Sequence, residues 1–363
     1  MANLKTTLCG VELDSPFVLG SGPLSYGAEG IIAAAKAGAG AVVTKTIRRE
    51  AAVNPTPHMA LCDGNSILNT EKWSDYPAER WINEEIQKCK EGGVKVLIAN
   101  IGGDRDELLE LAGPVEKAGA DIIEFSGSGY FDAGDLVSAV ADLKKEVSVP
   151  IIVKLNSNWS NTLEIAQQCI DAHVDGVTCM DSMGPTVRLD LATGAPRIGG
   201  NHGYGWITGA PMLPFTLQIV HTVARMTEKD IIGLGGITKA ADALEMLLAG
   251  ASCCGVCSAA IIRGVEYFGA LNRQLSDLMD QYGYASIADA SRKSLQFDEM
   301  NDQYHCSQFR FDPERCTECK RCMTVCPYNA RTLKDSVMTV DASRCRACGI
   351  CFDACPTKAI AIR

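Results

Sequence analysis

Residues 121–156 read DIIEFSGSGYFDAGDLVSAVADLKKEVSVPIIVKLN and predict a strand, a helix and a second strand. The two ends, DIIEFS and IIVKLN, are short apolar runs with β-branched residues, which favour extended structure. Between them lies LVSAVADLKKEV, whose apolar residues recur at helical spacing. Strands that alternate with helices imply parallel pairing, so this segment predicts one unit of a parallel α/β sheet.

The same kind of unit recurs along residues 1–265. Six further apolar runs occur there, with helical stretches between most of them: FVLG (17–20), AVVTKT (41–46), VLIANI (96–101), GVTCMD (176–181), IIGLGG (231–236) and CCGVCSA (253–259). Eight such runs within about 260 residues predict a (β/α)8 barrel. An open, doubly wound sheet is the weaker alternative, because GSGPLSYG (20–27) does not match the G-x-G-x-x-G pattern expected after its first strand.

Two connections after the strand runs are long. The first contains NPTPHMALCDGNSILNTEKWSDYPAERW (54–81), and the second contains SMGPTVRLDLATGAPRIGGNHGYGWITGAP (182–211). Both leave the C-terminal ends of predicted strands, which is where the active sites of such barrels lie. We therefore expect them to be binding loops or lids.

The C-terminal segment repeats the cysteine pattern C-x2-C-x2-C-x3-C-P, which is typical of ferredoxins with two [4Fe–4S] clusters. In this pattern three thiolates of one run bind one cluster and the fourth binds the other. One predicted ligand set is Cys316, Cys319, Cys322 and Cys355, and the other is Cys345, Cys348, Cys351 and Cys326. Zinc would explain paired C-x2-C steps. It would not explain why a third cysteine, a fourth cysteine and a proline follow at the same spacing in both runs. We expect residues 1–300 to form the barrel with a helical C-terminal extension, and 301–363 a small two-cluster ferredoxin-like α+β domain.

The overall composition excludes several classes of partner. The 363-residue chain has a formal net charge of −10, which disfavours nucleic acid and anionic membrane surfaces. No apolar run approaches the roughly 20 residues that span a bilayer, and the N-terminus, MANLKTTLCGVEL, lacks a signal-peptide core. We therefore expect a cytoplasmic protein.

Charged and glycine-rich positions cluster at the predicted strand ends. Lys45 and Lys154 end two strands, and two such lysines at one barrel mouth suggest an anionic ligand or an electron-rich ring. The loops after the last two strands, with Gly235-Gly236 and Cys257-Ser258, lie where barrels bind phosphate. Iron–sulfur clusters carry single electrons, whereas most substrates gain or lose two electrons. A flavin can accept electrons singly and pass on a hydride. FMN, with its single phosphate, fits one such site.

In sequence order, the motifs resemble the dihydroorotate dehydrogenase superfamily over nearly the whole chain, and most closely the FMN barrel and cluster segment of dihydropyrimidine dehydrogenase. These motifs are SPFVLGSGPLS (15–25), VTKT (43–46), ILNTEKWSDYPAERW (67–81), IVKL (152–155), GVTCMDS (176–182), TGAPMLPFTLQIVHTVAR (208–225), GLGGI (233–237) and CSA (257–259). The resemblance implies FMN contacts for Ser21, Gly22, Lys45, Asn100, Lys154, Ser182, Gly209, Gly235, Gly236, Cys257 and Ser258. It implies substrate contacts for Asn69, Ser126, Asp181 and Ser182, and we add His202 from the second long loop.

The chain departs from this family at the catalytic position. The family has an N-[LF]-S-C-P stretch whose cysteine, serine in some branches, is the general acid or base; here the segment reads EFSGSGY (124–130). The family asparagine falls on Ser126 and the cysteine on Gly129, which carries no proton. The candidate catalytic residues are therefore Tyr130, Ser128 and Asp181, with Lys154 at the N1/O2 edge of the flavin, and His202 and Tyr204 as further proton donors.

These expectations combine into a leading function and two alternatives. The leading one is an oxidoreductase that passes electrons through two [4Fe–4S] clusters to FMN, and then as a hydride to a conjugated C=C or C=N bond of a small, cyclic substrate. The donor would be ferredoxin or a separate NAD(P)H/FAD flavoprotein subunit, within a homo- or hetero-oligomer. The alternatives are a pyrimidine reductase or dehydrogenase (uracil, thymine or dihydroorotate) with a substitute proton donor, and an electron-transfer subunit without a substrate of its own.

Overall fold

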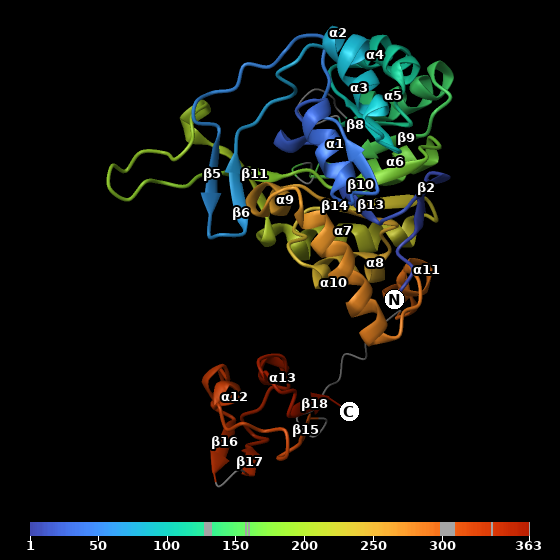
Figure 1. Ribbon diagram of the computed structural model, residues 1–363. Helices are drawn as coiled ribbons and strands as arrows, with labels where there is room; N and C mark the ends of the chain where they lie inside the picture. Colours follow the sequence, from blue (N-terminus) through green and yellow to red (C-terminus); the bar gives the residue numbers. More distant parts are fainter. Residues whose placement is uncertain (127–132, 157, 159, 298–308, 335–336, 363) are drawn as a thin grey trace. The chain divides into compact units, whose positions relative to one another are not determined.

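The computed structural model describes residues 1–126, 133–156, 158, 160–297, 309–334 and 337–362. The chain divides into two units, Met1–Gln296 and Phe297–Arg363. In Figure 1 the first unit runs from blue to orange and the second is red. Among the described residues, no helix combines the length and apolar character needed to cross a bilayer.

The first unit is built on a closed barrel of eight parallel strands (Figure 1). In chain order these are β3 (Phe17–Leu19), β4 (Ala41–Val43), β7 (Leu97–Ile101), β8 (Ile122–Ser126), β9 (Ile151–Lys154), β10 (Gly176–Cys179), β13 (Asp230–Leu234) and β14 (Cys253–Val256). Around the barrel the order is β10-β13-β14-β3-β4-β7-β8-β9. Each strand overlaps one of the eight apolar runs, which confirms the predicted (β/α)8 barrel.

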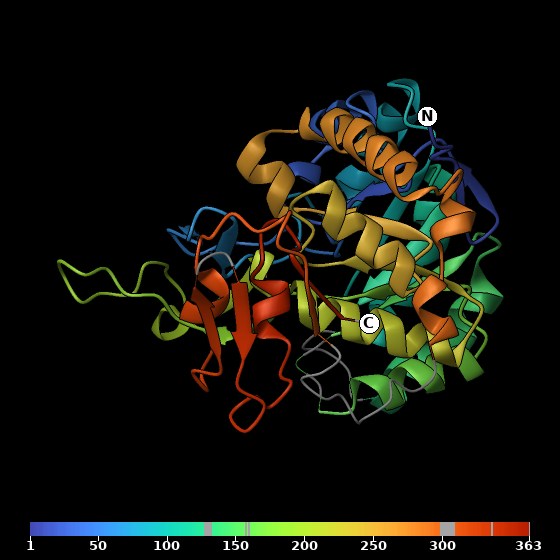
Figure 2. The same ribbon diagram turned by 90° about the horizontal axis from the view of Figure 1, so that it is seen from below.

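Helices cover the outside of the barrel, as two perpendicular views show (Figures 1 and 2). They are α1 (Ala28–Lys36), α2 (Ala78–Arg80), α3 (Ile86–Glu91), α4 (Arg105–Ala118), α5 (Ala133–Glu146), α6 (Thr162–Asp171), α7 (Leu213–Met226), α8 (Ala240–Ala249), α9 (Ser258–Arg263), α10 (Tyr267–Tyr282) and α11 (Ile287–Ala290). Local sequence sets their ends. At α4 the Asp104 carboxylate accepts a hydrogen bond of 2.9 Å from the Glu107 N–H, and Gly119 ends the helix with φ of 121°.

Alternation along the strands decides which side chains face the barrel interior. Ile98, Ile122 and Ile152 belong to one apolar cluster inside the barrel, whereas Leu97 and Ile123 belong to the larger core beneath the helices. A hairpin of β1 (Thr6–Leu8) and β2 (Val11–Leu13) contributes apolar residues to the inner cluster. The Cys9 N–H in its turn donates to Asp230, at the start of β13. The hairpin therefore closes the N-terminal end of the barrel and leaves the C-terminal end for a site.

The two long connections pair with each other. β5 (Met59–Cys62) and β6 (Ser66–Asn69) come from the first, and β11 (Met183–Thr186) and β12 (Gly205–Gly209) from the second. They form one antiparallel sheet in the order β11-β12-β6-β5, because β12 pairs with β6. The sequence predicted two loops but not their union into one sheet.

The second unit contains two small antiparallel pairs. β15 (Phe309–Phe311) pairs with β18 (Ile360–Ile362), and β16 (Arg331–Lys334) pairs with β17 (Val337–Val340). Two short helices, α12 (Arg321–Thr324) and α13 (Ile350–Asp353), each carry the third cysteine of one run. Antiparallel strand pairs and short helices thus occur together in this unit, as predicted for an α+β domain.

Candidate active site and cluster unit

The interior of the barrel becomes polar toward the C-terminal ends of its strands. Asn100, Glu124 and Lys154 each follow an inward-facing isoleucine by two residues, so they share its face of the strand. All three are nearly fully buried. The Glu124 carboxylate accepts hydrogen bonds from Asn100 Nδ2, at 2.6 Å, and from the Thr178 hydroxyl on β10. A buried carboxylate thus lies among three strands beneath the mouth of the barrel.

A cavity of about 590 Å³ opens at the same end. Its volume lies in the range of small-molecule sites. The structure brings most of the expected site residues to its lining: Ser21, Gly22, Lys45, Asn69, Ser126, Lys154, Asp181, Ser182, Gly209, Gly235, Gly236, Cys257 and Ser258. Strand ends and the four-stranded sheet supply this lining together.

The remaining expected residues lie elsewhere. Asn100 is not part of the lining; it is buried below it, and its Oδ1 atom has no hydrogen-bond partner among the described residues. His202 is exposed, with its ring 5.8 Å from that of Tyr204, and neither residue lines the cavity. Ser128 and Tyr130 fall outside the described residues. The position of His202 therefore gives no support to a substrate contact.

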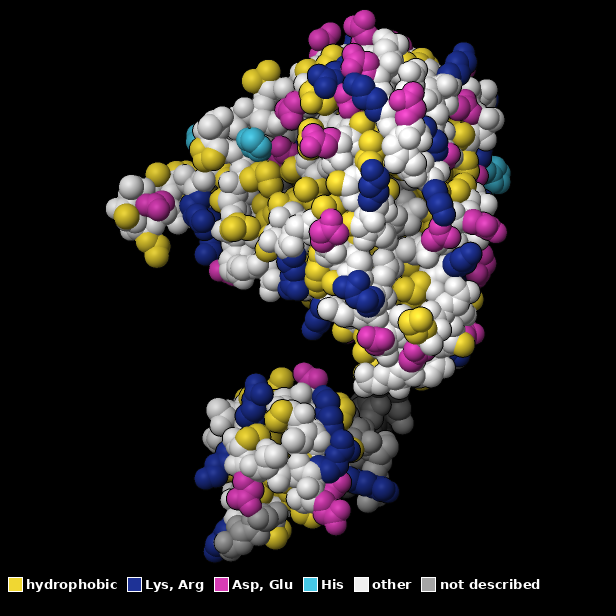
Figure 3. All heavy atoms as spheres, viewed as in Figure 1, with side chains coloured by type: hydrophobic (Ala, Val, Ile, Leu, Met, Phe, Trp, Pro, Cys, Tyr) yellow, Lys and Arg dark blue, Asp and Glu magenta, His cyan; other side chains and the backbone are white. Residues whose placement is uncertain are grey.

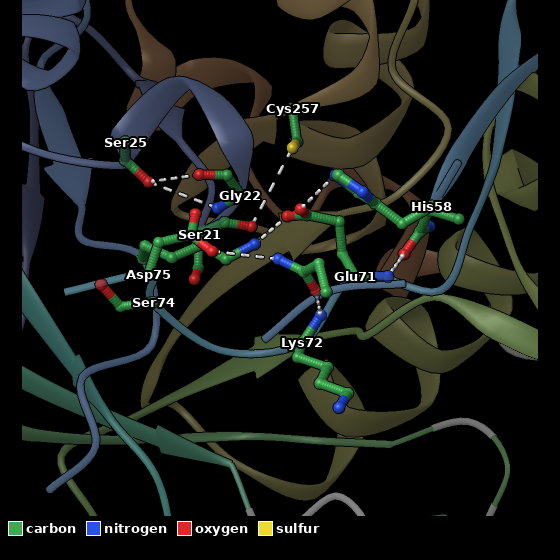
Figure 4. Close-up of polar contacts among 12 residues, drawn as sticks. Ser21, Gly22, Ser25, His58, Glu71, Lys72, Ser74, Asp75 and Cys257 are labelled. Carbon is green, nitrogen blue, oxygen red and sulfur yellow. Dashed lines mark hydrogen bonds and ion pairs between the residues drawn. The ribbon is translucent and has the colours of Figure 1, made fainter. Parts of the chain in front are cut away.

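Lys45 belongs to a chain of charged groups at the cavity. Its buried ammonium contacts the Glu71 carboxylate, whose other oxygen lies 3.2 Å from Nε2 of His58 (Figure 4). Nδ1 of His58 lies 3.0 Å from the Pro55 carbonyl, and the His58 side chain is 35% exposed. Burial of the Lys45 ammonium lowers its pKa to about 8. The chain therefore connects the cavity with solvent through an acid and a histidine.

Lys154 has its own carboxylate partner. Its Nζ atom lies 3.5 Å from Oδ1 of Asp181, and Glu124 is also near. Burial works against the Lys154 charge, yet attraction to Asp181 and Glu124 outweighs it and raises the pKa of Lys154. Both barrel-mouth lysines thus meet carboxylates of the chain itself. The two lysines alone therefore do not require an anionic ligand, and the inference from sequence that they contact an anionic ligand or an electron-rich ring stays a prediction.

Glu71 and His58 were missed as site residues. Glu71 lines the cavity two positions after Asn69, and its backbone N–H donates to Asn69 Oδ1 at 3.3 Å. Alternate side chains of an extended segment share one face, so the position two residues after Asn69 in ILNTEKWSDYPAERW could have indicated Glu71. Nothing in the sequence indicated His58, because its contact with Glu71 depends on how the long loop folds back.

The Gly235-Gly236 turn after β13 has no room for side chains. Gly236 has φ of 94°, and a Cβ atom there would lie 2.3 Å from the Leu213 nitrogen. A Cβ atom at Gly235, with φ of 130°, would lie 2.7 Å from the Thr216 hydroxyl oxygen, which is buried and has no hydrogen-bond partner within the described ranges. Both glycines line the cavity, so the turn presents bare backbone to it.

Gly236→Ala is expected to lower the free energy of unfolding by about 3 kcal/mol, because backbone strain and steric overlap add. Gly64→Ala is the matched control, since Gly64 has φ of 75° but nothing within 4 Å of its Cβ position. The control should lose only about 1 kcal/mol. Chemical denaturation measures both values, and equal losses would show that the overlap at Gly236 is unimportant.

The second unit gathers cysteines from both runs around one small pocket. Cys316, Cys319, Cys322 and Cys355 line it, together with apolar residues such as Met338 and Ile360. These four cysteines are one of the two predicted ligand sets. Within the described ranges, no three His, Cys, Asp or Glu side chains gather closely enough to hold a single metal ion.

Backbone amides stabilise the fourth cysteine of each run as a thiolate. The Ala330 N–H lies 3.4 Å from Sγ of Cys326, and the Ala359 N–H lies 3.2 Å from Sγ of Cys355. At both cysteines burial raises the pKa, but the hydrogen bonds outweigh it and the net pKa is lowered. Deprotonated thiols are the form that binds metal. The residues present therefore fit cluster ligation.

Comparison with known proteins agrees with both units. Residues 3–279 match the family model described as dihydroorotate dehydrogenase, and residues 315–359 match a 4Fe-4S dicluster domain. The family match, together with the barrel, indicates an oxidoreductase that acts on CH–CH groups. The chain belongs to the dihydroorotate dehydrogenase family.

The chain is also similar to several individual dihydroorotate dehydrogenases. The chain is 29% identical over 299 residues to the catalytic subunit of dihydroorotate dehydrogenase B (NAD(+)) from Thermoplasma acidophilum, covering 80% of this chain and 98% of that protein. It is 30% identical over 301 residues to the same subunit from Methanothermobacter thermautotrophicus, with coverages of 78% and 96%. Dihydroorotate dehydrogenase A (fumarate) from Lactobacillus delbrueckii subsp. bulgaricus is 29% identical over 276 residues, with coverages of 71% and 88%.

A solved structure also resembles the barrel. Eimeria tenella DHODH in complex with ferulenol superposes with a TM-score of 0.69 at 20% identity, covering 81% of this chain and 89% of that one. This likeness supports the fold. The family binds FMN, and the lined cavity and the bare turn at Gly235-Gly236 fit such a cofactor.

Proposed function

We propose that this chain is an FMN-dependent oxidoreductase that takes electrons through two [4Fe–4S] clusters and delivers a hydride to a conjugated C=C or C=N bond. The observation that carries the proposal is the presence, in one chain, of the family's lined cavity and of a pocket formed by four cysteines from both runs. Bound FMN would exchange electrons singly with clusters and as a pair with substrate. A small, cyclic substrate matches a cavity of about 590 Å³ that also has to hold the flavin.

Residues of the chain hold and orient these groups in the proposal. Lys154 and Lys45 keep positive charge at the cavity, and Asp181 and Asn69 offer an acceptor and an amide to the substrate. The Asn69 amide already donates to the Trp206 carbonyl at 3.1 Å, which fixes its orientation against β12. The four-stranded sheet supplies residues of β6 and β12 to the cavity lining.

In this chain another group must supply the proton that the cysteine supplies in other members of the family. Asp181 and Glu71 are carboxylates of the cavity lining, and each contacts a buried lysine. Glu71 differs because His58 contacts its second oxygen and is partly exposed. Histidine exchanges protons near neutral pH. We infer that His58 and Glu71 deliver the proton, alongside the candidates Tyr130 and Ser128.

His58→Gln is expected to lower turnover by about 10²-fold while the flavin content stays unchanged, because only proton delivery is lost. His221→Gln on α7 is the control, since His221 is not part of the cavity lining. An unchanged rate in His58→Gln would assign the proton to another group.

The proposed electron donor is ferredoxin or a flavoprotein subunit that carries FAD and binds NAD(P)H. Several relatives are described as catalytic subunits, which implies a second subunit in those enzymes. We propose a corresponding hetero-oligomer here.

The test of function is reoxidation of the reduced protein without oxygen. The protein, photoreduced anaerobically, is mixed with orotate, uracil, thymine, cyclic enones and cyclic imines, and flavin absorbance is followed. Reoxidation by an enone or imine alone supports the leading proposal. Reoxidation by orotate or uracil favours the pyrimidine function, which the names of the relatives support. No reoxidation by any of them would leave only an electron-transfer role.

A further inference from the structure

Arg331, on β16 in the second unit, is a buried arginine. It is 5% exposed, whereas Arg310, Arg315, Arg321, Arg344 and Arg346 are exposed in the same unit. Figure 3 shows Lys and Arg side chains on the surface of this unit, where such charges are solvated. Burying a guanidinium is unfavourable unless something nearby carries negative charge. Arg331 therefore needs a physical reason.

The protein contacts of Arg331 do not supply that reason. Its Nη1 atom donates to the Met338 sulfur at 3.2 Å, and its guanidinium carbon lies 5.4 Å from the centre of the Phe309 ring. Its Nη2 atom is buried and has no hydrogen-bond partner in the part of the chain that the structure describes. Among the described residues, no carboxylate forms an ion pair with Arg331. A buried cation with an open donor implies a negative group that belongs to the working protein.

The internal repeat of the unit shows what faces this position. Arg331 follows Cys326 by five residues, and Ile360 follows Cys355 by five residues. The alanine before each of these residues makes the same contact. The Ala330 N–H donates to Sγ of Cys326, and the Ala359 N–H donates to Sγ of Cys355. Ile360 lines the pocket of Cys316, Cys319, Cys322 and Cys355. The repeat therefore places Arg331 where the other half has a residue facing a cluster.

The surroundings of Arg331 connect it with both ligand sets. It directly follows Ala330, whose N–H donates to Sγ of Cys326 in the second set. It also contacts Met338, which lines the pocket of the first set. Arg331 is therefore near thiols of both sets.

We propose that Arg331 is a positioned charge that makes the cluster pair easier to reduce. The inference rests on the proposed two-cluster function. A reduced cluster with its thiolates carries one more negative charge than the oxidised one, and a buried cation stabilises the reduced form. Because the equivalent residue in the other half is Ile360, the repeat is unequal in charge, and the two clusters differ in potential.

The experiment is a redox titration of the full-length protein, followed by electron paramagnetic resonance. Arg331→Met is expected to shift the midpoint of at least one cluster to more negative potential, by about tenfold in the reduction equilibrium, or about 59 mV for one electron. Arg331→Lys should retain most of the wild-type midpoint, and Arg321→Met, which removes an exposed charge next to Cys322, should change it little. Iron is measured in every variant.

The outcomes separate this inference from the function on which it rests. Wild-type protein with about four iron atoms instead of about eight would overturn the two-cluster proposal, whatever the variants do. A full iron content in Arg331→Met with unchanged midpoints overturns the role of Arg331. If Arg331→Met loses iron, Arg331→Gln and Arg331→Lys are compared. Iron loss in Arg331→Gln as well, with no shift in the remaining cluster, assigns Arg331 a purely structural role and also overturns the proposal.

Discussion

Replacing Lys154 by methionine is expected to reduce turnover by about 10²- to 10³-fold, the usual effect of removing one positioned electrostatic group. Methionine keeps the apolar stem but removes the charge that lies 3.5 Å from Asp181. Two carboxylates, Asp181 and Glu124, would then share the mouth of the barrel without their cation. The measurements are the flavin retained after gel filtration and the rate of hydride transfer in a single turnover.

Lys144→Met provides the control for Lys154→Met. Lys144 forms a comparable ion pair, 2.7 Å from Asp175, but on the outside of the barrel. Surface pairs of this kind contribute at most about 1 kcal/mol, so activity should be unaffected. Equal, small effects of the two substitutions would mean that Lys154 is only a structural partner of Asp181.

Cys355→Ser is expected to remove one cluster and to reduce iron from about eight to about four atoms per chain. Reduction of the flavin by an external donor should fall to background, because the relay is interrupted. Reduction of the flavin by the reduced form of the substrate should continue, since the cavity is unchanged. Iron analysis and stopped-flow absorbance measure the two effects separately.

The identity of the lost cluster is the sharper part of this prediction. Cys355 lies at the pocket of Cys316, Cys319 and Cys322, although it belongs to the second run. Cys355→Ser and Cys322→Ser should therefore abolish the same paramagnetic signal, and Cys326→Ser the other one. If Cys355→Ser instead matches Cys348→Ser, each run binds its own cluster and the crossed assignment is wrong.

Patterns that repeat at fixed spacing predicted the architecture well. The eight apolar runs became the eight barrel strands, because strands buried on both faces need little besides local apolar character. Both the family and the ferredoxin-type segment followed from residues close together in sequence. The alternation that carries Ile152 inward also carries Lys154 inward, so much of the cavity lining was predictable.

Contacts between distant loops were not predictable in the same way. The partners of the two lysines, Glu71 and Asp181, were absent from the electrostatic argument, so the lysines seemed to require a ligand charge. His58 meets Glu71 only because the loop returns along β5 and β6. Such pairings depend on tertiary geometry, which no local pattern in a single sequence encodes.

The sheet that joins the two long connections has a consequence for changing what the enzyme accepts. β6 and β12 exchange backbone hydrogen bonds from Ser66–Asn69 to Trp206–Gly209, and both strands contribute residues to the cavity. If only one of these segments were exchanged for that of a relative, its strand would have to pair with a β6 or β12 strand from a different protein. We expect selectivity to transfer between family members only when both segments are exchanged together, as one graft.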